Sequence, residues 1–184
     1  MTVSTDFEGL INRRFFKNLL PIPGWRGLGL GQFPPDFALQ DVTYQRTVRL
    51  TNYRGKQPLV LAFTRIFTEK QYCPFCFPHI LALNEAYDQF LDLGAEVLMI
   101  TSTDLRQSQR VVRDLGLKLP LLSDESCQSF RRYHTGQALG APLPAQFVLD
   151  AQGRLRYSHP FSFLEHNAAP ERLLAVLAAV TPLD

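Results

Sequence analysis

The stretch Cys73-Pro74-Phe75-Cys76 constrains the fold more than any other part of this chain. It follows an apolar run at residues 59–63 that is typical of a buried strand, and a segment with helical periodicity comes after it. A thiolate at the start of a helix is stabilised by free backbone N–H groups and by the helix dipole. Two cysteines at this spacing can also close a disulfide within one helical turn. The sequence therefore predicts a redox dithiol at a strand-to-helix junction.

The two cysteines are expected to have different roles. We place Cys73 at the N-cap of the helix, where its sulfur would be exposed and would act as the nucleophile. Pro74 would then occupy the first helical position, where its missing N–H is not needed. Cys76, one turn later, is expected to be more buried and to resolve a mixed disulfide.

Two other interpretations of the pair remain open. The cysteines could be buried structural thiols, or they could form half of a zinc site. Zinc usually needs a second pair of ligands, and the remaining candidates, Cys127 and His134, have no recognised spacing. His79 is not adjacent to Cys76, so the haem-attachment motif is absent.

Composition limits the class of protein. The chain has 184 residues, of which 46% are hydrophobic and 20% are charged, as expected for a globular domain with an extension. Its net charge of +2 gives no indication of a nucleic-acid partner. Three cysteines do not indicate a disulfide scaffold and favour a cytoplasmic location. The beginning of the chain does not have the pattern of a secretory signal, and no apolar run approaches the roughly 20 residues of a membrane span.

The first part of the chain differs from the rest. We divide the chain into an N-terminal helical extension with a linker, residues 1–31, and one domain, residues 32–184. Apolar residues recur at helical spacing in the extension, which we expect to pack on the domain: Phe7, Leu10, Ile11, Phe15, Leu19 and Leu20. Arg13, Arg14 and Lys17 leave open a docking or membrane-surface role.

The domain alternates strand-like and helix-like segments. Strands are expected at 37–39, 48–50, 59–63, 97–100, 119–122, 147–149 and 155–157. Helices are expected after the cysteines up to Gly94, at 105–115 with Ser102 or Thr103 as N-cap and Gly116 at its end, at 125–133, and at 171–180 after Pro170. This order predicts an α/β fold with a mixed central sheet that is parallel in the middle and antiparallel at one edge.

Several motifs resemble one known family. They are Pro34-Pro35-Asp36-Phe37, Asn52-Tyr53-Arg54-Gly55-Lys56, the strand at 59–63, the Cys73–Cys76 motif, Ser123-Asp124, and Pro144-Ala145 followed by residues 147–150 and Gly153. In order and spacing they resemble the peroxiredoxin-like (AhpC/TSA) branch of the thioredoxin superfamily, over about residues 33–180. The resemblance implies a thioredoxin-like fold with an inserted N-terminal β-hairpin. It also implies that Pro144 is cis beside the cysteines, with the Leu143 carbonyl facing a bound substrate.

The chain departs from the family's pattern near the first cysteine. A typical peroxiredoxin has a proline seven residues, and a threonine three residues, before its reactive cysteine, and this chain has Ile66 and Lys70 there. Leu143 and Pro144 also stand where an arginine is expected. Arg65 corresponds to an arginine found near the cysteine in similar sequences. Arg65 and Lys70 are expected either to lower the Cys73 pKa or to be solvated loop charges.

These features predict a thiol-dependent oxidoreductase with an antioxidant role. Cys73 and Cys76 would act in disulfide exchange or hydroperoxide reduction, with Arg65, Leu143 and Pro144 as substrate-binding residues. A thioredoxin-type protein would be the reductant, a disulfide-containing protein or a peroxide would be the substrate, and no cofactor or metal is needed. The alternative is a binding or scaffold protein on a redox fold, which would use aromatic residues of the N-terminal region: Phe15, Phe16, Trp25 and Phe33.

The third cysteine and two of the histidines are not expected to take part in the reaction. Cys127 is expected to be half-buried and unreactive, although a resolving role stays open if its sulfur reaches the site. His134 and His159 lie near loop ends and are expected to be structural.

Overall fold

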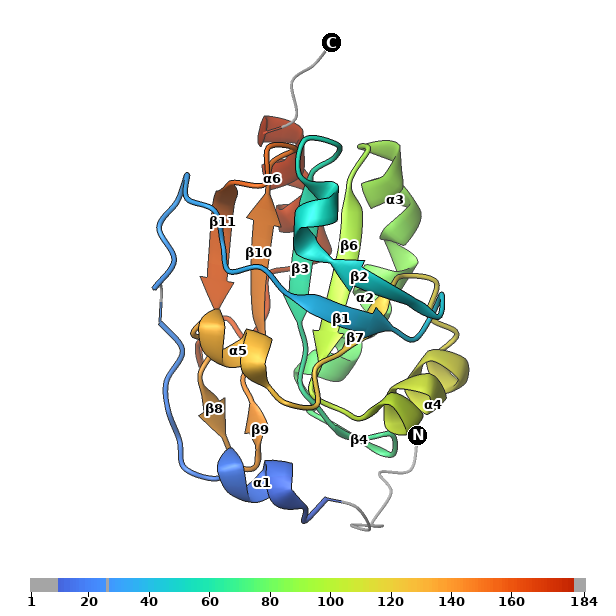
Figure 1. Cartoon of the computed structure of the whole chain (residues 1–184), viewed down its shortest axis with the longest axis vertical. Helices are drawn as coiled ribbons and strands as arrows, with labels where there is room; N and C mark the ends of the chain where they lie inside the picture. Colours follow the sequence, from blue (N-terminus) through green and yellow to red (C-terminus); the bar gives the residue numbers. More distant parts are fainter. Residues whose placement is uncertain (1–9, 26, 181–184) are drawn as a thin grey trace.

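The computed structural model describes residues 10–25 and 27–180 and is built around one seven-stranded sheet (Figure 1). The strand order is β11-β10-β3-β6-β7-β1-β2. Strands β3, β6 and β7 are parallel, and the remaining pairs are antiparallel. The bounds are β1 Ala38–Asp41, β2 Arg46–Arg49, β3 Leu59–Phe63, β6 Glu96–Thr101, β7 Leu121–Ser123, β10 Ala145–Leu149 and β11 Leu155–Pro160. The predicted mixed sheet and the N-terminal β-hairpin, β1–β2, are confirmed.

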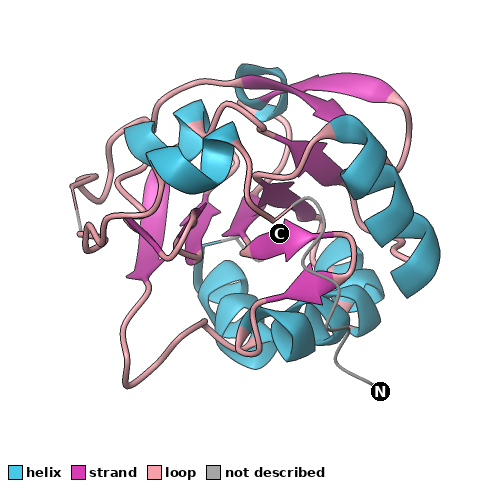
Figure 2. Ribbon diagram, turned by 90° about the horizontal axis from the view of Figure 1, so that it is seen from below, coloured by secondary structure: helices cyan, strands magenta, loops and turns pink. Residues whose placement is uncertain are grey.

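Helices lie on both faces of the sheet (Figure 2). They are α1 Arg13–Lys17, α2 Cys76–Glu85, α3 Tyr87–Asp92, α4 Leu105–Leu115, α5 Gln128–Arg132 and α6 Pro170–Val180, with a 3₁₀ turn at Leu50–Tyr53. One core includes apolar residues of α2, α3, α4 and α6, and a second core on the other face is rich in aromatic residues. None of the described helices is long and apolar enough to cross a bilayer.

The central strand explains where the cysteines lie. All five residues of β3 are buried, as expected for a strand covered on both faces. Phe63 at its end pairs with Ile100 of β6 on one side and with Ala145 of β10 on the other. The chain leaves the sheet at Phe63 and reaches the cysteines ten residues later, at the carboxyl edge of the parallel strands.

Two small hairpins lie at the end of the sheet that carries the cysteines. The first joins β4 Ile66–Thr68 to β5 Gln71–Tyr72 and fills the segment between β3 and the cysteines. The second joins β8 Gln137–Ala138 to β9 Ala141–Pro142, directly before β10. Figure 1 shows α1 at this same end of the molecule.

Some element boundaries differ from the predicted ones. Helix α4 spans Leu105–Leu115 as predicted, but its N-cap is Asp104 and not Ser102 or Thr103, because the Asp104 carboxylate accepts a hydrogen bond from the Gln107 N–H at 2.7 Å. Gly116 ends it in the left-handed conformation, with φ of 59°, as predicted. The helix after the cysteines breaks at Ala86 into α2 and α3.

The N-terminal segment packs on the domain, as expected. Helix α1 spans only Arg13–Lys17, and Phe7 of the predicted helix lies outside the described residues. After α1 the chain runs extended, and Ile22 pairs with Gln137 of β8 through two backbone hydrogen bonds of 2.7 Å. Further along, the Gly31 N–H donates to the Leu155 carbonyl of β11 at 2.7 Å.

Candidate redox site

The two cysteines flank the turn between β5 and α2. The N–H groups of Cys76 and Phe77 both donate to the Cys73 carbonyl at 3.0 Å. Helix α2 begins at Cys76, and Phe75 is its N-cap, so the placement of Cys73 at the N-cap was wrong by two residues. The reason is that Pro74 and Phe75 form a turn ahead of the helix and are not its first residues.

Both sulfur-bearing residues are buried. Cys73 is 4% exposed and Cys76 is 0% exposed, so the expected exposure of Cys73 was wrong, while the deeper burial of Cys76 is confirmed. The Cys73 N–H donates to the Arg65 carbonyl at 3.4 Å, which holds the first cysteine against the start of the β4–β5 hairpin. The side chain between them, Phe75, is 53% exposed and stacks on His166 with ring centroids 3.8 Å apart.

The thiols are free and differ strongly in acidity. All three cysteines are unpaired. A hydrogen bond from the Cys76 side chain, together with the N–H groups of Phe75 and Cys76 and the charge of Arg65, lowers the pKa of Cys73 to about 6, against the opposing effect of burial. The same side-chain hydrogen bond, burial and the neighbouring negative charge raise the pKa of Cys76. The opposite pKa shifts favour the negative charge on Cys73 and the proton on Cys76.

Arg65 is the cation beside the first cysteine. Its side chain interacts with Cys73 through charge and a hydrogen bond, and it also donates to the Ala138 carbonyl of β8. The guanidinium carbon lies 4.6 Å from the centroid of the Phe67 ring. Burial lowers the Arg65 pKa, and the buried Nε has no hydrogen-bond partner among the described residues. Arg65 is thus buried at the site and is not a solvated loop charge.

Two of the residues that depart from the family's pattern, Ile66 and Lys70, lie in the β4–β5 hairpin. Ile66 is fully buried and pairs with Tyr72, the residue directly before Cys73. The Lys70 N–H donates to the Thr68 hydroxyl at 3.2 Å, within the turn of the hairpin. A strand residue, Ile66, thus occupies the position of the family's proline, and the segment before Cys73 is a hairpin.

Leu143 and Pro144 connect β9 to β10 and are both buried. The expectation of a cis bond at Pro144 was wrong, because there is no cis peptide among the described residues. The Leu143 N–H donates to the Gly136 carbonyl at 3.0 Å, Ala145 pairs with Phe63, and a trans link joins the two strands. This pairing brings the link to the end of β3 from which Arg65 also emerges.

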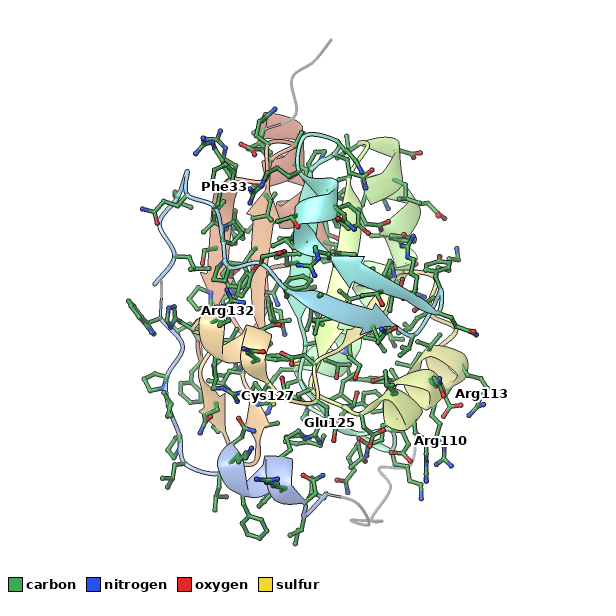
Figure 3. The ribbon with its side chains drawn as sticks, in the orientation of Figure 1. Phe33, Arg110, Arg113, Glu125, Cys127 and Arg132 are labelled. Carbon is green, nitrogen blue, oxygen red and sulfur yellow. The ribbon has the colours of Figure 1, made fainter. Side chains whose placement is uncertain are left out.

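Cys127 lies between α5 and α1, outside the dithiol (Figure 3). It is 2% exposed, so the expectation of half-burial was wrong, and its sulfur donates to the Glu125 carbonyl at 3.7 Å. Asn18 donates to the same sulfur at 3.8 Å, and burial raises the Cys127 pKa. A buried thiol that stays protonated is a poor nucleophile.

The two predicted structural histidines make packing and backbone contacts. The ring of His134 lies 4.6 Å from that of Trp25, and Nε2 of His159 contacts the Glu165 carbonyl at 3.0 Å. The described residues contain no group of three or more His, Cys, Asp or Glu side chains that could hold a metal ion.

The sequence did not predict that residues 166–168, which follow β11, contact the turn between the cysteines and helix α2. Besides the His166 stack, the Asn167 side chain donates to the Phe75 carbonyl at 3.0 Å. Burial lowers the pKa of His79 to about 4, and its Nε2 contacts the Ala168 carbonyl at 2.8 Å. Nothing in the local sequence around 166–168 indicates these contacts, since they depend on how β11 returns the chain to α2.

The acidity of Cys73 leads to a pH-dependent prediction. Since its pKa is lowered, the thiolate is present above about pH 6 and is lost as the pH falls through that value. The rate of Cys73 alkylation by iodoacetamide is expected to rise with a midpoint near pH 6 and to level off by about pH 7.5. Peptide mass spectrometry follows each cysteine separately. A midpoint near 8.5, the ordinary value for cysteine, would contradict the assigned thiolate.

Comparison with known proteins identifies the family. The AhpC/TSA family matches residues 30–158. A wheat protein, "Peroxiredoxin Q, chloroplastic" from Triticum aestivum, is 30% identical over 78% of this chain and 64% of its own length. "Putative peroxiredoxin ycf42" from Porphyra purpurea is 30% identical over 86% of this chain and 81% of its own length. The chain thus spans just under two thirds of the wheat relative.

Solved structures agree on the fold. The reduced 2-Cys peroxiredoxin of Plasmodium vivax has a TM-score of 0.71 at 20% identity, covering 82% of this chain and 81% of that chain. AhpC of Enterococcus faecalis has a TM-score of 0.69 at 16% identity, covering 82% of this chain and 91% of that chain. The family match, which includes the dithiol, and these fold neighbours lead to one conclusion: the chain belongs to the AhpC/TSA family, the peroxiredoxins of the thioredoxin superfamily.

Proposed function

We propose that this protein is a thiol-dependent peroxidase in which Cys73 is the nucleophile and Cys76 is the resolving thiol. The observation that carries the proposal is the pairing of a Cys73 pKa of about 6 with a hydrogen-bonded, protonated Cys76 next to a buried guanidinium. A thiolate is needed to attack the peroxide, and a nearby thiol is needed to close the disulfide. Family membership supports the same reaction class.

The reaction balances with the two cysteines, a proton from solvent and an external dithiol. The Cys73 thiolate attacks one oxygen of a hydroperoxide, the O–O bond breaks, and the leaving alkoxide takes a proton from solvent to become an alcohol. Cys73 is then a sulfenic acid. The Cys76 sulfur attacks the Cys73 sulfur, water leaves, and a Cys73–Cys76 disulfide forms. A thioredoxin-type dithiol reduces this disulfide by thiol–disulfide exchange and is itself oxidised.

The residues around the dithiol have proposed roles in this cycle. Arg65, whose buried Nε has no hydrogen-bond partner in the described part of the chain, would donate to a peroxide oxygen and stabilise the charge that develops on it. Leu143 and Pro144 would line the approach to Cys73. Since Cys76 already hydrogen-bonds Cys73, disulfide closure would not require a second chain or a distant segment.

A second candidate is exchange with a disulfide-containing protein substrate. The observation that favours it is the occupation of the family's proline and threonine positions by Ile66 and Lys70. Those family residues shape the peroxide pocket, and their absence is expected to slow peroxide reduction but not attack on a disulfide.

The location of the protein in the cytoplasm stays a prediction, as does the identity of the reductant as a thioredoxin-type protein.

A stopped-flow measurement separates the two candidates. The reduced protein is mixed with hydrogen peroxide or with an oxidised dithiol such as oxidised thioredoxin, and Cys73 oxidation is followed by intrinsic fluorescence. The peroxidase proposal predicts a peroxide rate constant at least 10²-fold above that of free cysteine, on the order expected for a positioned and activated thiolate. A peroxide rate equal to that of free cysteine, together with fast oxidation by the disulfide, would replace the first candidate by the second.

A further inference from the structure

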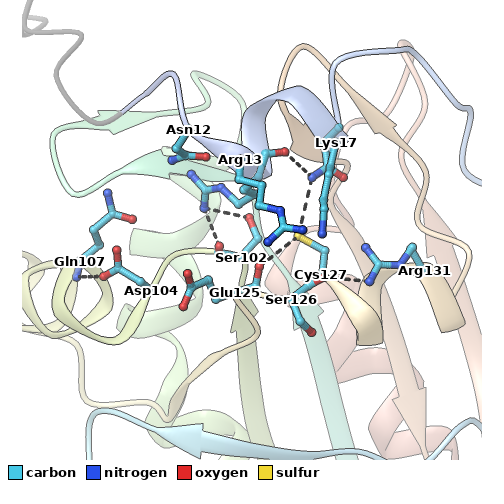
Figure 4. A pocket seen from close by; sticks show the side chains of 12 residues that line it. Asn12, Arg13, Lys17, Ser102, Asp104, Gln107, Glu125, Ser126, Cys127 and Arg131 are labelled. Carbon is cyan, nitrogen blue, oxygen red and sulfur yellow. Dashed lines mark hydrogen bonds between the residues drawn. The ribbon is translucent and has the colours of Figure 1, made fainter.

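Arg14 of α1 joins two parts of the molecule that flank the dithiol. Its Nη1 donates to the Ser102 carbonyl at 2.5 Å and contacts the Ser102 hydroxyl at 3.3 Å, directly after β6. Its Nη2 donates to the Phe67 carbonyl in β4. One guanidinium therefore ties the β4–β5 hairpin to the end of the sheet. Figure 4 shows Ser102 beneath the residues of α1.

Two contacts position the Arg65 side chain, and we call them its supports. The first is the ring of Phe67, the residue whose carbonyl accepts a hydrogen bond from Arg14. The Arg65 guanidinium carbon lies 4.6 Å from the Phe67 ring centroid, a cation–π distance. Because Arg14 hydrogen-bonds the Phe67 backbone, the position of this ring depends on α1.

The second support of Arg65 is the Ala138 carbonyl, in a hairpin that is hydrogen-bonded to residues 18–22. Arg65 donates to the Ala138 carbonyl, and the residues on both sides of Ala138 bond to residues 18–22. Gln137 exchanges two backbone hydrogen bonds with Ile22. After Ala138, the N–H groups of Leu139 and Gly140 donate to the carbonyls of Leu19 and Asn18, at 3.3 and 3.0 Å.

Helix α1 also packs tightly on this hairpin. Gly140 has a φ of +83°, and a Cβ placed there would lie 2.0 Å from the Phe15 ring. The Phe15 side chain therefore occupies the space above Gly140, on the hairpin that carries the Arg65 acceptor.

Arg14 bonds backbone and not the acidic side chains near it. It borders a cavity of about 630 Å³ that is also lined by Arg13, Lys17, Asp104, Glu125 and Cys127 (Figure 4). The negative groups Asp104 and Glu125 attract the guanidinium, yet both of its terminal nitrogens donate to carbonyls. Bonds to two fixed carbonyls set the geometry of the backbone, which a flexible surface ion pair would not do.

We propose that Arg14 is a positioning residue for the thiol reaction, because the N-terminal segment holds both supports of Arg65 and thereby keeps its guanidinium against Cys73. Arg14 does not touch the reacting atoms. It acts on them through Phe67 and Arg65, and residues 18–22 act through Ala138. The N-terminal segment then positions an active-site residue from outside the active site. The proposal rests on the assignment of Cys73 as the nucleophile.

The test compares Arg14→Ala with Arg13→Ala in the full-length protein. Arg13 is the adjacent, exposed residue of the same helix, so its replacement removes the same charge without the two carbonyl contacts. The pH midpoint of Cys73 alkylation is measured for each variant. Arg14→Ala is expected to raise the midpoint from about 6 toward 7, because the bonds from Cys76 and the backbone N–H groups remain, and to lower the thiolate fraction and the alkylation rate at pH 7 by about twofold. Arg13→Ala is expected to leave the midpoint unchanged.

A second variant separates positioning from folding. Phe67→Leu keeps the backbone carbonyl that Arg14 binds but removes the ring beneath Arg65, and it is expected to raise the midpoint as well. If Arg14→Ala lowers the thermal unfolding midpoint while the alkylation midpoint stays near 6, the role is structural and the proposal is overturned. An unmoved midpoint in Phe67→Leu would overturn it too, even if Arg14→Ala does not fold. A wild-type peroxide rate equal to that of free cysteine would defeat the peroxidase function, but a raised midpoint in Arg14→Ala would still support the positioning role.

Discussion

Replacement of Cys73 by serine is expected to abolish peroxide turnover. The pKa of a serine hydroxyl is far above that of Cys73, which is about 6, and a serine oxygen cannot form the disulfide that completes the cycle. The loss in turnover should be on the order of 10³-fold or more, because the nucleophile itself is removed. Peroxide consumption with dithiothreitol as reductant measures this loss.

The matched control for this variant is Cys127→Ser. Cys127 is buried beside Asn18 and Glu125, and its pKa is raised, so its removal should leave turnover within about twofold of wild type. Cys76→Ser completes the set. Mild oxidation should lower the mass of the wild type and of Cys127→Ser by about 2 Da, the mass of two hydrogens lost in disulfide formation. The same loss in Cys76→Ser, or full turnover in Cys73→Ser, would contradict the proposed dithiol.

The parts of the fold that could be predicted are those specified by local residues. The apolar run at 59–63 is long enough and uniform enough to indicate a strand buried on both faces. Gly116 and Pro170 mark the end of one helix and the start of another through their own backbone preferences, and both predictions are confirmed. The dithiol could be located because its spacing, its preceding strand and its following helix are all contiguous.

The local environment of the dithiol could not be predicted in the same way. Cys73 is buried and lies two residues before the N-cap, since residues 66–72 fold into a hairpin that leads directly into it. Pro144 has a trans bond and leads into β10, whose pairing with β3 joins segments far apart in sequence. The contacts that hold Arg65 come from Phe67, Ala138 and, indirectly, the N-terminal segment. No local periodicity encodes such contacts, because they form only when the two hairpins and α1 meet.

The largest effect on stability is expected from Phe63→Ala, at the last residue of β3. The Phe63 ring is fully buried and contacts three other rings, with centroid distances of 5.0 Å to Phe130, 4.9 Å to Tyr133 and 5.7 Å to Phe147. Truncation removes these contacts and leaves a cavity that a packed core fills only in part. The free energy of unfolding should fall by about 3–5 kcal/mol. Urea unfolding followed by circular dichroism measures it.

The matched control, Phe163→Ala, removes the same ring from a residue that is 89% exposed, and its effect should stay within about 0.5 kcal/mol. The cluster also bears on the site, because the chain passes from Phe63 to Arg65 in two residues and Phe63 pairs with Ala145 next to Pro144. Phe63→Leu, which keeps most of the volume, is therefore expected to lose less stability and to retain the Cys73 alkylation midpoint near pH 6. Equal losses in Phe63→Ala and Phe163→Ala would contradict the close packing of Phe63 against the three rings.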